Sequence, residues 1–302
     1  MVSAVRSCQA VGKWMAVCKA YEPSRVSTQA LYRIPALAIE RIYRHLPEET
    51  FCKFVGLLVG PESLNFSNNQ TLDDAALARL VKKCPCLKRL DVSGCPKLTA
   101  QGFASLKLPP TLEVFRANNS SIDEAGFKNL MDSCRGLVQL QLARCPKLMV
   151  DMVEDFSYPP QLQSVDFSQG LILGAGLKKL LTECTSLHTI GLMGCMGIRD
   201  EDYQTLNWPK TLQEVDLSRT HLAIKGLHNL FEKTEKLKKI TMKECIYLPL
   251  DALDVAFPNT LEVIILDRNL GKFTRPDLFS QCKNLKILSL KECPDLTQYS
   301  FN

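Results

Sequence analysis

Histidine is scarce in this sequence, since only four occur among 302 residues, at His45, His188, His221 and His228. They lie scattered, and none has an evident partner for catalysis or metal binding. The chain also lacks the G-x-S-x-G, P-loop, H-E-x-x-H and G-x-G-x-x-G motifs. These absences argue against the enzyme classes that carry such motifs. We therefore expect no catalytic residues, no cofactor and no enzymatic activity.

An excess of one charge and a long apolar run are missing as well. The 37 basic and 32 acidic residues leave a net charge of +5, which is too small to indicate nucleic-acid binding. No apolar run reaches the roughly 18 residues that suggest a membrane span. Arg6, Gln9 and Lys13 interrupt the start of the chain, which is atypical of a signal peptide. We expect a cytoplasmic or nuclear protein with reduced thiols.

A motif of the form L-x-x-L-x-L recurs along most of the chain. Copies begin at positions 87, 112, 137, 162, 187, 212, 237, 261 and 285, so that six steps of 25 residues are followed by two of 24. A weaker first copy lies at residues 64–66. Ten copies at such a constant spacing predict a repeat domain over residues 61–302, with about ten coils of 24–26 residues each.

Each copy predicts one coil of a solenoid. The alternation in L-x-L indicates a short strand with one buried face. About eight residues later, apolar residues at helical spacing, such as Phe127, Leu130 and Met131, indicate a helix. One coil cannot bury its apolar face alone, whereas stacked coils share a core. The sequence therefore predicts an α/β solenoid roughly 43 Å long, with a parallel sheet on its concave side and helices on its convex side.

A second, longer period of about 50 residues is visible. Every second copy is preceded by a turn in which a large apolar residue is followed directly by proline. These pairs are Leu108 and Pro109, Tyr158 and Pro159, Trp208 and Pro209, and Phe257 and Pro258. We expect proline to stop the convex helix early in these coils. Tyr158 and Trp208 are interpreted as packing residues rather than as binding aromatics.

Nine of the thirteen cysteines stand at repeat positions. Five close the strand motif (Cys95, Cys145, Cys195, Cys245 and Cys293), and four end the convex helix (Cys84, Cys134, Cys184 and Cys282). Residues that recur once per double coil stay in separate coils and do not converge on one metal ion. We expect buried thiols that act as small apolar groups and donate to turn carbonyls. Cys84 and Cys86 could pair as metal ligands, but no further ligand is suitably spaced.

The motif L-x-x-L-x-L-x-x-C, followed by stretches such as "KLTAQGF" and "GIRDEDY", resembles the cysteine-containing class of leucine-rich repeats. The resemblance covers residues 61–302. It implies a horseshoe-shaped recognition module. From the positions of the cysteines in separate coils we expect no metal site. Many members of the family are substrate receptors of ubiquitin ligases, either F-box/leucine-rich-repeat proteins or relatives of the antagonist of mitotic exit network protein.

Residues 1–60 lack the repeat, and three interpretations remain open. They can form a helical cap that covers the first coil. Residues 34–54 also resemble an F-box, with apolar anchors that would bind a Skp-type adaptor at Ile34, Pro35, Ile42, Leu46, Phe51 and Phe54. Alternatively, Ser3 and Cys8 are similar to the box that binds elongins B and C, with Ile34 and Pro35 as a downstream cullin-type motif.

Strand residues that point away from the core line the concave face, where we expect a protein partner to bind. The candidate residues are Arg89, Asp91, Arg116, Gln139, Gln141, Arg144, Asp166, Met193, Asp216, Arg219, Lys243, Val263, Ile265, Arg268 and Ile287. Val263, Ile265 and Ile287 should lie side by side within a rim formed by Lys243, Arg268 and Lys291. An apolar centre with a charged rim is typical of a protein-binding hot spot. Packing against a further C-terminal segment is the alternative interpretation of the same residues.

Overall fold

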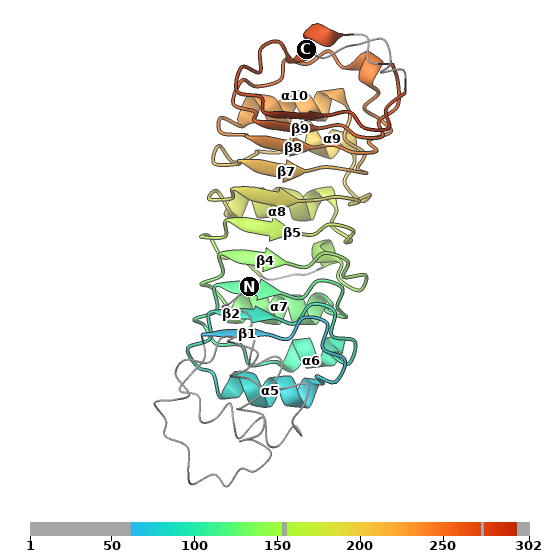
Figure 1. Ribbon diagram of the computed structural model, residues 1–302. Coiled ribbons are helices and arrows are strands. Elements are labelled where there is room, and N and C mark those ends of the chain that lie inside the picture. The colour runs from blue at the N-terminus through green and yellow to red at the C-terminus, as the bar shows by residue number, and fades with distance from the viewer. Residues whose placement is uncertain (1–61, 153–155, 273–274, 295–302) are drawn as a thin grey trace, which may run out of the picture.

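The computed structural model describes residues 62–152, 156–272 and 275–294. In these ranges the chain forms a solenoid-like α/β fold around one sheet of ten parallel strands. Strand order follows chain order, as Figure 1 shows. Each strand has three residues: β1 (Ser63–Asn65), β2 (Arg89–Asp91), β3 (Val114–Arg116), β4 (Gln139–Gln141), β5 (Ser164–Asp166), β6 (Thr189–Gly191), β7 (Glu214–Asp216), β8 (Lys239–Thr241), β9 (Val263–Ile265) and β10 (Ile287–Ser289). The predicted α/β class and parallel sheet are confirmed, while the expectations for residues 1–60 fall outside the described ranges.

Helical segments that connect the strands alternate between long and short from β1 to β9, and the segment between β9 and β10 is short again. The long helices start 50 residues apart and have nine or ten residues: α5 (Asp74–Lys82), α7 (Glu124–Ser133), α8 (Gly174–Glu183) and α10 (Ile224–Lys233). The short ones are α6 (Ala100–Ser105), η1 (Val150–Met152), α9 (Asp200–Tyr203), η2 (Leu250–Ala252) and η3 (Pro276–Phe279). In Figure 1, α7, α8 and α10 lie behind the sheet. None of the helices in the described ranges is long and apolar enough to cross a membrane.

This alternation confirms the predicted unit of about 50 residues, but proline is not what stops the short helices. Helix α6 ends at Ser105, and the backbone is already extended at Leu106, three residues before Pro109. Tyr158 and Trp208 are 1% and 3% exposed, so their predicted packing role is confirmed. Tyr158 contacts Phe127 and Phe156 edge to face, and Trp208 stacks on Tyr203. The large apolar residue before each proline turn therefore fills the core space that a long helix fills in neighbouring coils.

One residue per coil, just after the strand, has a left-handed backbone. The ten residues with positive φ at this position are Asn68, Gly94, Asn119, Arg144, Gln169, Gly194, Arg219, Glu244, Arg268 and Glu292. This conformation costs most residues about 1 kcal/mol or more. It allows the backbone N–H to donate to a carbonyl of the next coil, for example Gly194 to Ser218 at 2.8 Å. The turn thus extends the hydrogen-bonded ladder beyond the end of each strand.

The nine repeat cysteines are buried, whereas Cys86 is exposed. Each cysteine that closes a strand motif donates its thiol to a carbonyl of the preceding coil, as from Cys95 to Phe66 (3.1 Å), Cys145 to Ala117 (3.2 Å) and Cys245 to Leu217 (3.2 Å). The predicted role of these thiols as buried donors is confirmed. Among the described residues, no cluster of three or more His, Cys, Asp or Glu side chains could hold a metal ion.

Candidate protein-binding surface

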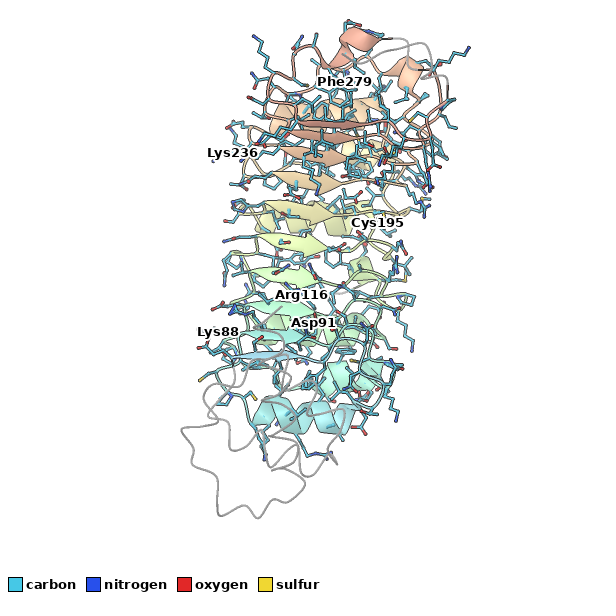
Figure 2. All side chains as sticks on the ribbon, viewed as in Figure 1. Lys88, Asp91, Arg116, Cys195, Lys236 and Phe279 are labelled. Carbon is cyan, nitrogen blue, oxygen red and sulfur yellow. The ribbon has the colours of Figure 1, made fainter. Side chains whose placement is uncertain are left out.

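The outer face of the sheet carries the predicted binding residues. The middle residue of nearly every strand is buried, and its two neighbours are mostly half-buried or exposed. Arg89, Asp91, Arg116, Gln139, Gln141, Asp166, Asp216, Val263, Ile265 and Ile287 stand at these outward positions on the strands, while Met193 and Lys243 follow two residues after β6 and β8. Arg144, Arg219 and Arg268 occupy the left-handed turn position. Figure 2 shows Asp91 and Arg116 on this face of the stack.

Polar residues near the start of this face are engaged with each other. Parallel register places Arg116 beside Asp91 on one side and Gln141 on the other. The Arg116 guanidinium donates to Oε1 of Gln139 at 3.1 Å. This region is therefore a polar surface that neighbouring strands build together, rather than a row of independent charges.

The aspartates on this face have a local structural function. Oδ1 of Asp91, Asp166 and Asp216 accepts the backbone N–H two residues further on, at 3.0, 2.9 and 2.9 Å. In all three cases that residue is a serine, so the sequence pattern D-x-S marks a turn that an aspartate closes. One carboxylate oxygen of each aspartate therefore stabilises the turn that follows the strand.

The three apolar residues predicted to cluster lie on the last two strands. Val263 on β9 is the direct register partner of Ile287 on β10, and Ile265 is the partner of Ser289. Ile287 is 54% exposed, while Val263 and Ile265 are half-buried. The predicted juxtaposition is confirmed. Val263, Ile265 and Ile287 are called the β9–β10 patch below.

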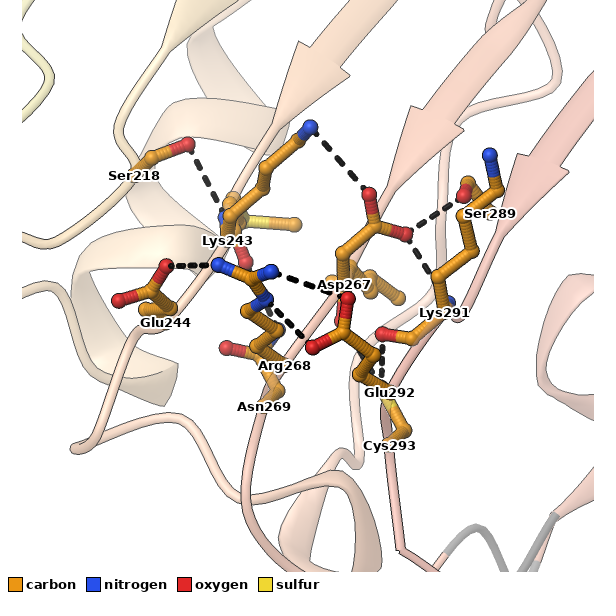
Figure 3. Close-up of polar contacts among 12 residues, drawn as sticks. Ser218, Lys243, Glu244, Asp267, Arg268, Asn269, Ser289, Lys291, Glu292 and Cys293 are labelled. Atoms are coloured by element: carbon orange, nitrogen blue, oxygen red, sulfur yellow. Dashed lines mark hydrogen bonds and ion pairs between the residues drawn. The ribbon is translucent and has the colours of Figure 1, made fainter.

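The charged rim of this patch is largely neutralised by three acidic residues, Glu244, Asp267 and Glu292. Lys243 pairs with Asp267 at 3.3 Å, and Arg268 pairs with both Glu244 (3.5 Å) and Glu292 (2.9 Å). Figure 3 shows these contacts, together with the hydrogen bond from Ser289 to Asp267. Burial raises the pKa of Asp267, but its hydrogen bonds to Ser289, Lys291 and Lys243 outweigh burial, and the pKa lies below its usual value. The rim is therefore a ladder of alternating charges rather than a positive ring.

A second exposed apolar feature was missed in the sequence. Leu171, Met196, Ile246 and Leu270 are 48, 55, 57 and 55% exposed. Each stands seven residues after the first residue of its strand, in coils that follow β5, β6, β8 and β9. His221 has the same place after β7, and its ring contacts that of Tyr247 edge to face. These four apolar residues are called the strand-end ridge below. The sequence could have revealed them, because each stands seven positions after the first residue of a predicted strand.

No protein-family model matches the chain. No curated protein matches it significantly either.

Proposed function

We propose that this chain is a leucine-rich-repeat recognition protein that binds a protein partner on its sheet face and presents it to a ubiquitin ligase. The observation that carries the binding function is the β9–β10 patch, where a half-exposed Ile287 lies against Val263 on the last two strands of the sheet, beside charged side chains. Large apolar side chains surrounded by polar groups are the usual centre of a protein interface. The horseshoe curvature typical of the family would bring the ends of the sheet toward a bound partner.

The size of the face supports a protein rather than a small ligand. Ten strands at roughly 4.8 Å spacing extend over about 43 Å. A standard protein complex buries about 800 Å² on each partner, which such a face can supply. The strand residues also lack the enclosed, mostly apolar cavity that small ligands favour, because their side chains project outward from a continuous sheet.

The link to a ubiquitin ligase rests on the sequence of residues 34–54. Ile34, Ile42, Leu46 and Phe51 would be the apolar anchors that dock a Skp-type adaptor. In this arrangement the N-terminal segment binds the ligase, and the sheet face binds the substrate. The elongin-type alternative uses Ser3 and Cys8 instead, and it gives the same division of roles.

A stand-alone binding or inhibitory scaffold is the second candidate function. It is favoured by the short distance between Phe54 and the start of β1 at Ser63, only nine residues later. A segment so close to the first strand is suited to covering the open end of the core. In that case residues 1–60 stabilise the repeat domain and bind no adaptor.

Co-purification of the full chain with a Skp-type adaptor, and separately with elongins B and C, tests the ligase function. A stoichiometric complex that Ile42→Asp or Leu46→Asp abolishes, in folded protein, is the expected result. Ile287→Asp serves as the control, because it changes the substrate face and should leave the adaptor complex intact. Full binding of the Skp-type adaptor by both N-terminal variants contradicts the F-box interpretation, and no complex with any of the adaptors contradicts the ligase proposal.

Deletion of residues 1–60 tests the scaffold function. A cap predicts that the shortened chain unfolds at a lower temperature than the full chain. Equal melting temperatures would eliminate the cap as the role of this segment.

A further inference from the structure

A groove lined with lysines lies at the edge of the sheet where the strands begin. It has a volume of about 750 Å³ and opens to solvent beside β8, β9 and β10. Lys236, Lys238, Lys283 and Lys286 line it together with Glu235 and Glu262. Figure 2 shows Lys236 on the same edge of the stack as Lys88, away from Cys195 near the opposite edge. These six residues are called the lysine groove.

The glutamates of the groove are already paired. Glu262 lies 2.6 Å from Nζ of Lys286 and 3.9 Å from Nζ of Lys238. Glu235 lies 2.6 Å from Nζ of Lys210, on the neighbouring coil. The hydrogen bond from Lys210, with a smaller contribution from Lys236, lowers the pKa of Glu235, so this carboxylate stays ionised.

Lys236 and Lys283 have no such partner, because neither forms an ion pair with any residue in the described ranges. Both are exposed. With four lysines and two glutamates, the groove carries two positive charges in excess. The ammonium groups of Lys236 and Lys283 are therefore the positive charges of the groove that can attract the carboxylates of a ligand.

The lysine groove is continuous with the β9–β10 patch. Lys238, Glu262 and Lys286 immediately precede Lys239, Val263 and Ile287, which are register partners on β8, β9 and β10. A segment that crosses from the groove onto the sheet would place charged groups on the lysines and apolar side chains on Val263 and Ile287. A surface of this kind suits a chain that carries both types of residue.

We propose that the lysine groove and the β9–β10 patch together bind an acidic segment of a partner protein, with large apolar side chains between its carboxylates. This assignment rests on the proposed function, because it specifies which partner the sheet face recognises. Lys236 and Lys283 stand in coils two apart, which corresponds to roughly 10 Å along the stack. An extended chain covers that distance in about three residues. The motif that fits is thus an acidic residue at i and i+3 with an apolar residue between them.

A nucleic acid fits this surface less well than a peptide. Glu235 and Glu262 lie in the wall of the groove, where they would repel a phosphate backbone. Ile287 offers an aliphatic surface rather than an aromatic platform on which bases stack.

Fluorescence polarisation with the full chain tests the proposal. The probe is a labelled synthetic peptide that repeats the unit Glu-Leu-Gly-Glu, and the same peptide with lysine in place of glutamate is the negative probe. A double variant, Lys236→Glu with Lys283→Glu, should weaken binding at least about tenfold and reduce its dependence on salt. Ile287→Asp should also weaken binding, because it places a carboxylate on the apolar part of the site.

The matched control is Lys97→Glu with Lys107→Glu. These lysines are exposed and form no ion pair with a described residue, and the change in net charge is the same. This control should bind the acidic peptide like the unmodified chain, and all variants should share its melting temperature. Equal weakening by both double variants would show a general charge effect and overturn the proposal.

Two other outcomes also overturn it. One is the absence of binding to the acidic peptide. The other is equally tight binding of a DNA duplex that the Lys236 and Lys283 variant abolishes, which would assign the groove to a polyanion. The peptide assay needs no adaptor, so its failure is separate from a failure of adaptor co-purification.

Discussion

Cys195 donates its thiol hydrogen to the backbone carbonyl of Phe167, with 3.2 Å between Sγ and O. The two residues are 28 positions apart in the sequence and belong to consecutive coils. The same contact recurs along the stack, so each of these cysteines ties its coil to the preceding one.

Replacing Cys195 by alanine should therefore destabilise the fold. Cys195→Ala removes a buried sulfur atom and a donor to Phe167, and we expect the free energy of unfolding to fall by about 1–3 kcal/mol. Denaturant unfolding measures the change. Cys86→Ala is the control, because Cys86 is exposed and its removal should stay within about 0.5 kcal/mol. Equal effects of the two substitutions would show that the thiol contact contributes nothing.

Stability should decrease in alkali. Burial raises the pKa of Cys134, Cys184 and Cys195 from 9.0 to about 12. The folded state keeps these thiols protonated. Their contribution to the free energy of unfolding is therefore complete below about pH 9 and is lost as the pH rises toward about 12. Each thiol that ionises only in the unfolded chain lowers the free energy of unfolding by about 1.4 kcal/mol per pH unit.

Urea unfolding between about pH 8 and pH 10.5 measures this dependence. Cys195→Ala should lose stability less steeply with pH than the unmodified chain, because it has one buried thiol fewer. The slope for Cys86→Ala should be closer to that of the unmodified chain, because this substitution leaves the nine buried repeat cysteines in place. Identical slopes for Cys195→Ala and the unmodified chain would contradict the prediction.

Gly194 should be sensitive to any branched side chain. Its φ of +71° is unfavourable for other residues, and an added Cβ would lie 3.3 Å from Cγ of Gln169. We expect Gly194→Val to cost about 1–2 kcal/mol or more. Met193→Val, one residue earlier and half-buried, should be milder. Thermal unfolding compares the two, and a Gly194→Val variant as stable as Met193→Val would refute the role of the left-handed turn.

Asn229 on α10 should be important because its side chain binds the preceding coil. Nδ2 donates to the carbonyls of Tyr203 (2.9 Å) and Leu206 (2.8 Å). Asn229→Leu leaves these carbonyls without that donor, and we expect a loss of about 1–3 kcal/mol. Lys225→Leu, at an exposed position of the same helix, should be nearly neutral. Chemical denaturation of both variants tests the difference, and a neutral Asn229→Leu would count against the contact.

Asn129 provides an independent repetition of this experiment. It makes the same two contacts 100 residues earlier, from α7 to Phe103 and Leu106. Asn129→Leu should therefore cost a similar amount. A large difference between the two sites would indicate that the coils are not energetically equivalent.

The candidate site was only partly predictable from the sequence. The strand register follows from the repeat, so the positions of Val263, Ile265 and Ile287 on one face could be predicted. The pairing of Lys243 with Asp267, and of Arg268 with Glu292, could not be predicted from the strand pattern alone. Each pair joins residues 24 positions apart, and whether they meet depends on the rotation between coils and on side-chain rotamers. The same holds for the lysine groove, in which Lys210 rather than a groove lysine neutralises Glu235.

The sequence by itself determined the repeating part of the architecture. The spacing of leucines specifies where each strand lies, and the alternation of helix and proline turn specifies the 50-residue unit, because both depend on local periodicity and burial. Tertiary structure alone decided how the coils are joined. Helices α8 and α10 have no side-chain cap of their own, and Asp151 and Asp200 of the preceding coils accept hydrogen bonds from the backbone of Leu173 (2.5 Å) and Ala223 (2.8 Å). The strand-end ridge likewise exists only because stacking brings equivalent residues of successive coils into one row. Such contacts require the coils to be stacked first, so no short stretch of sequence encodes them.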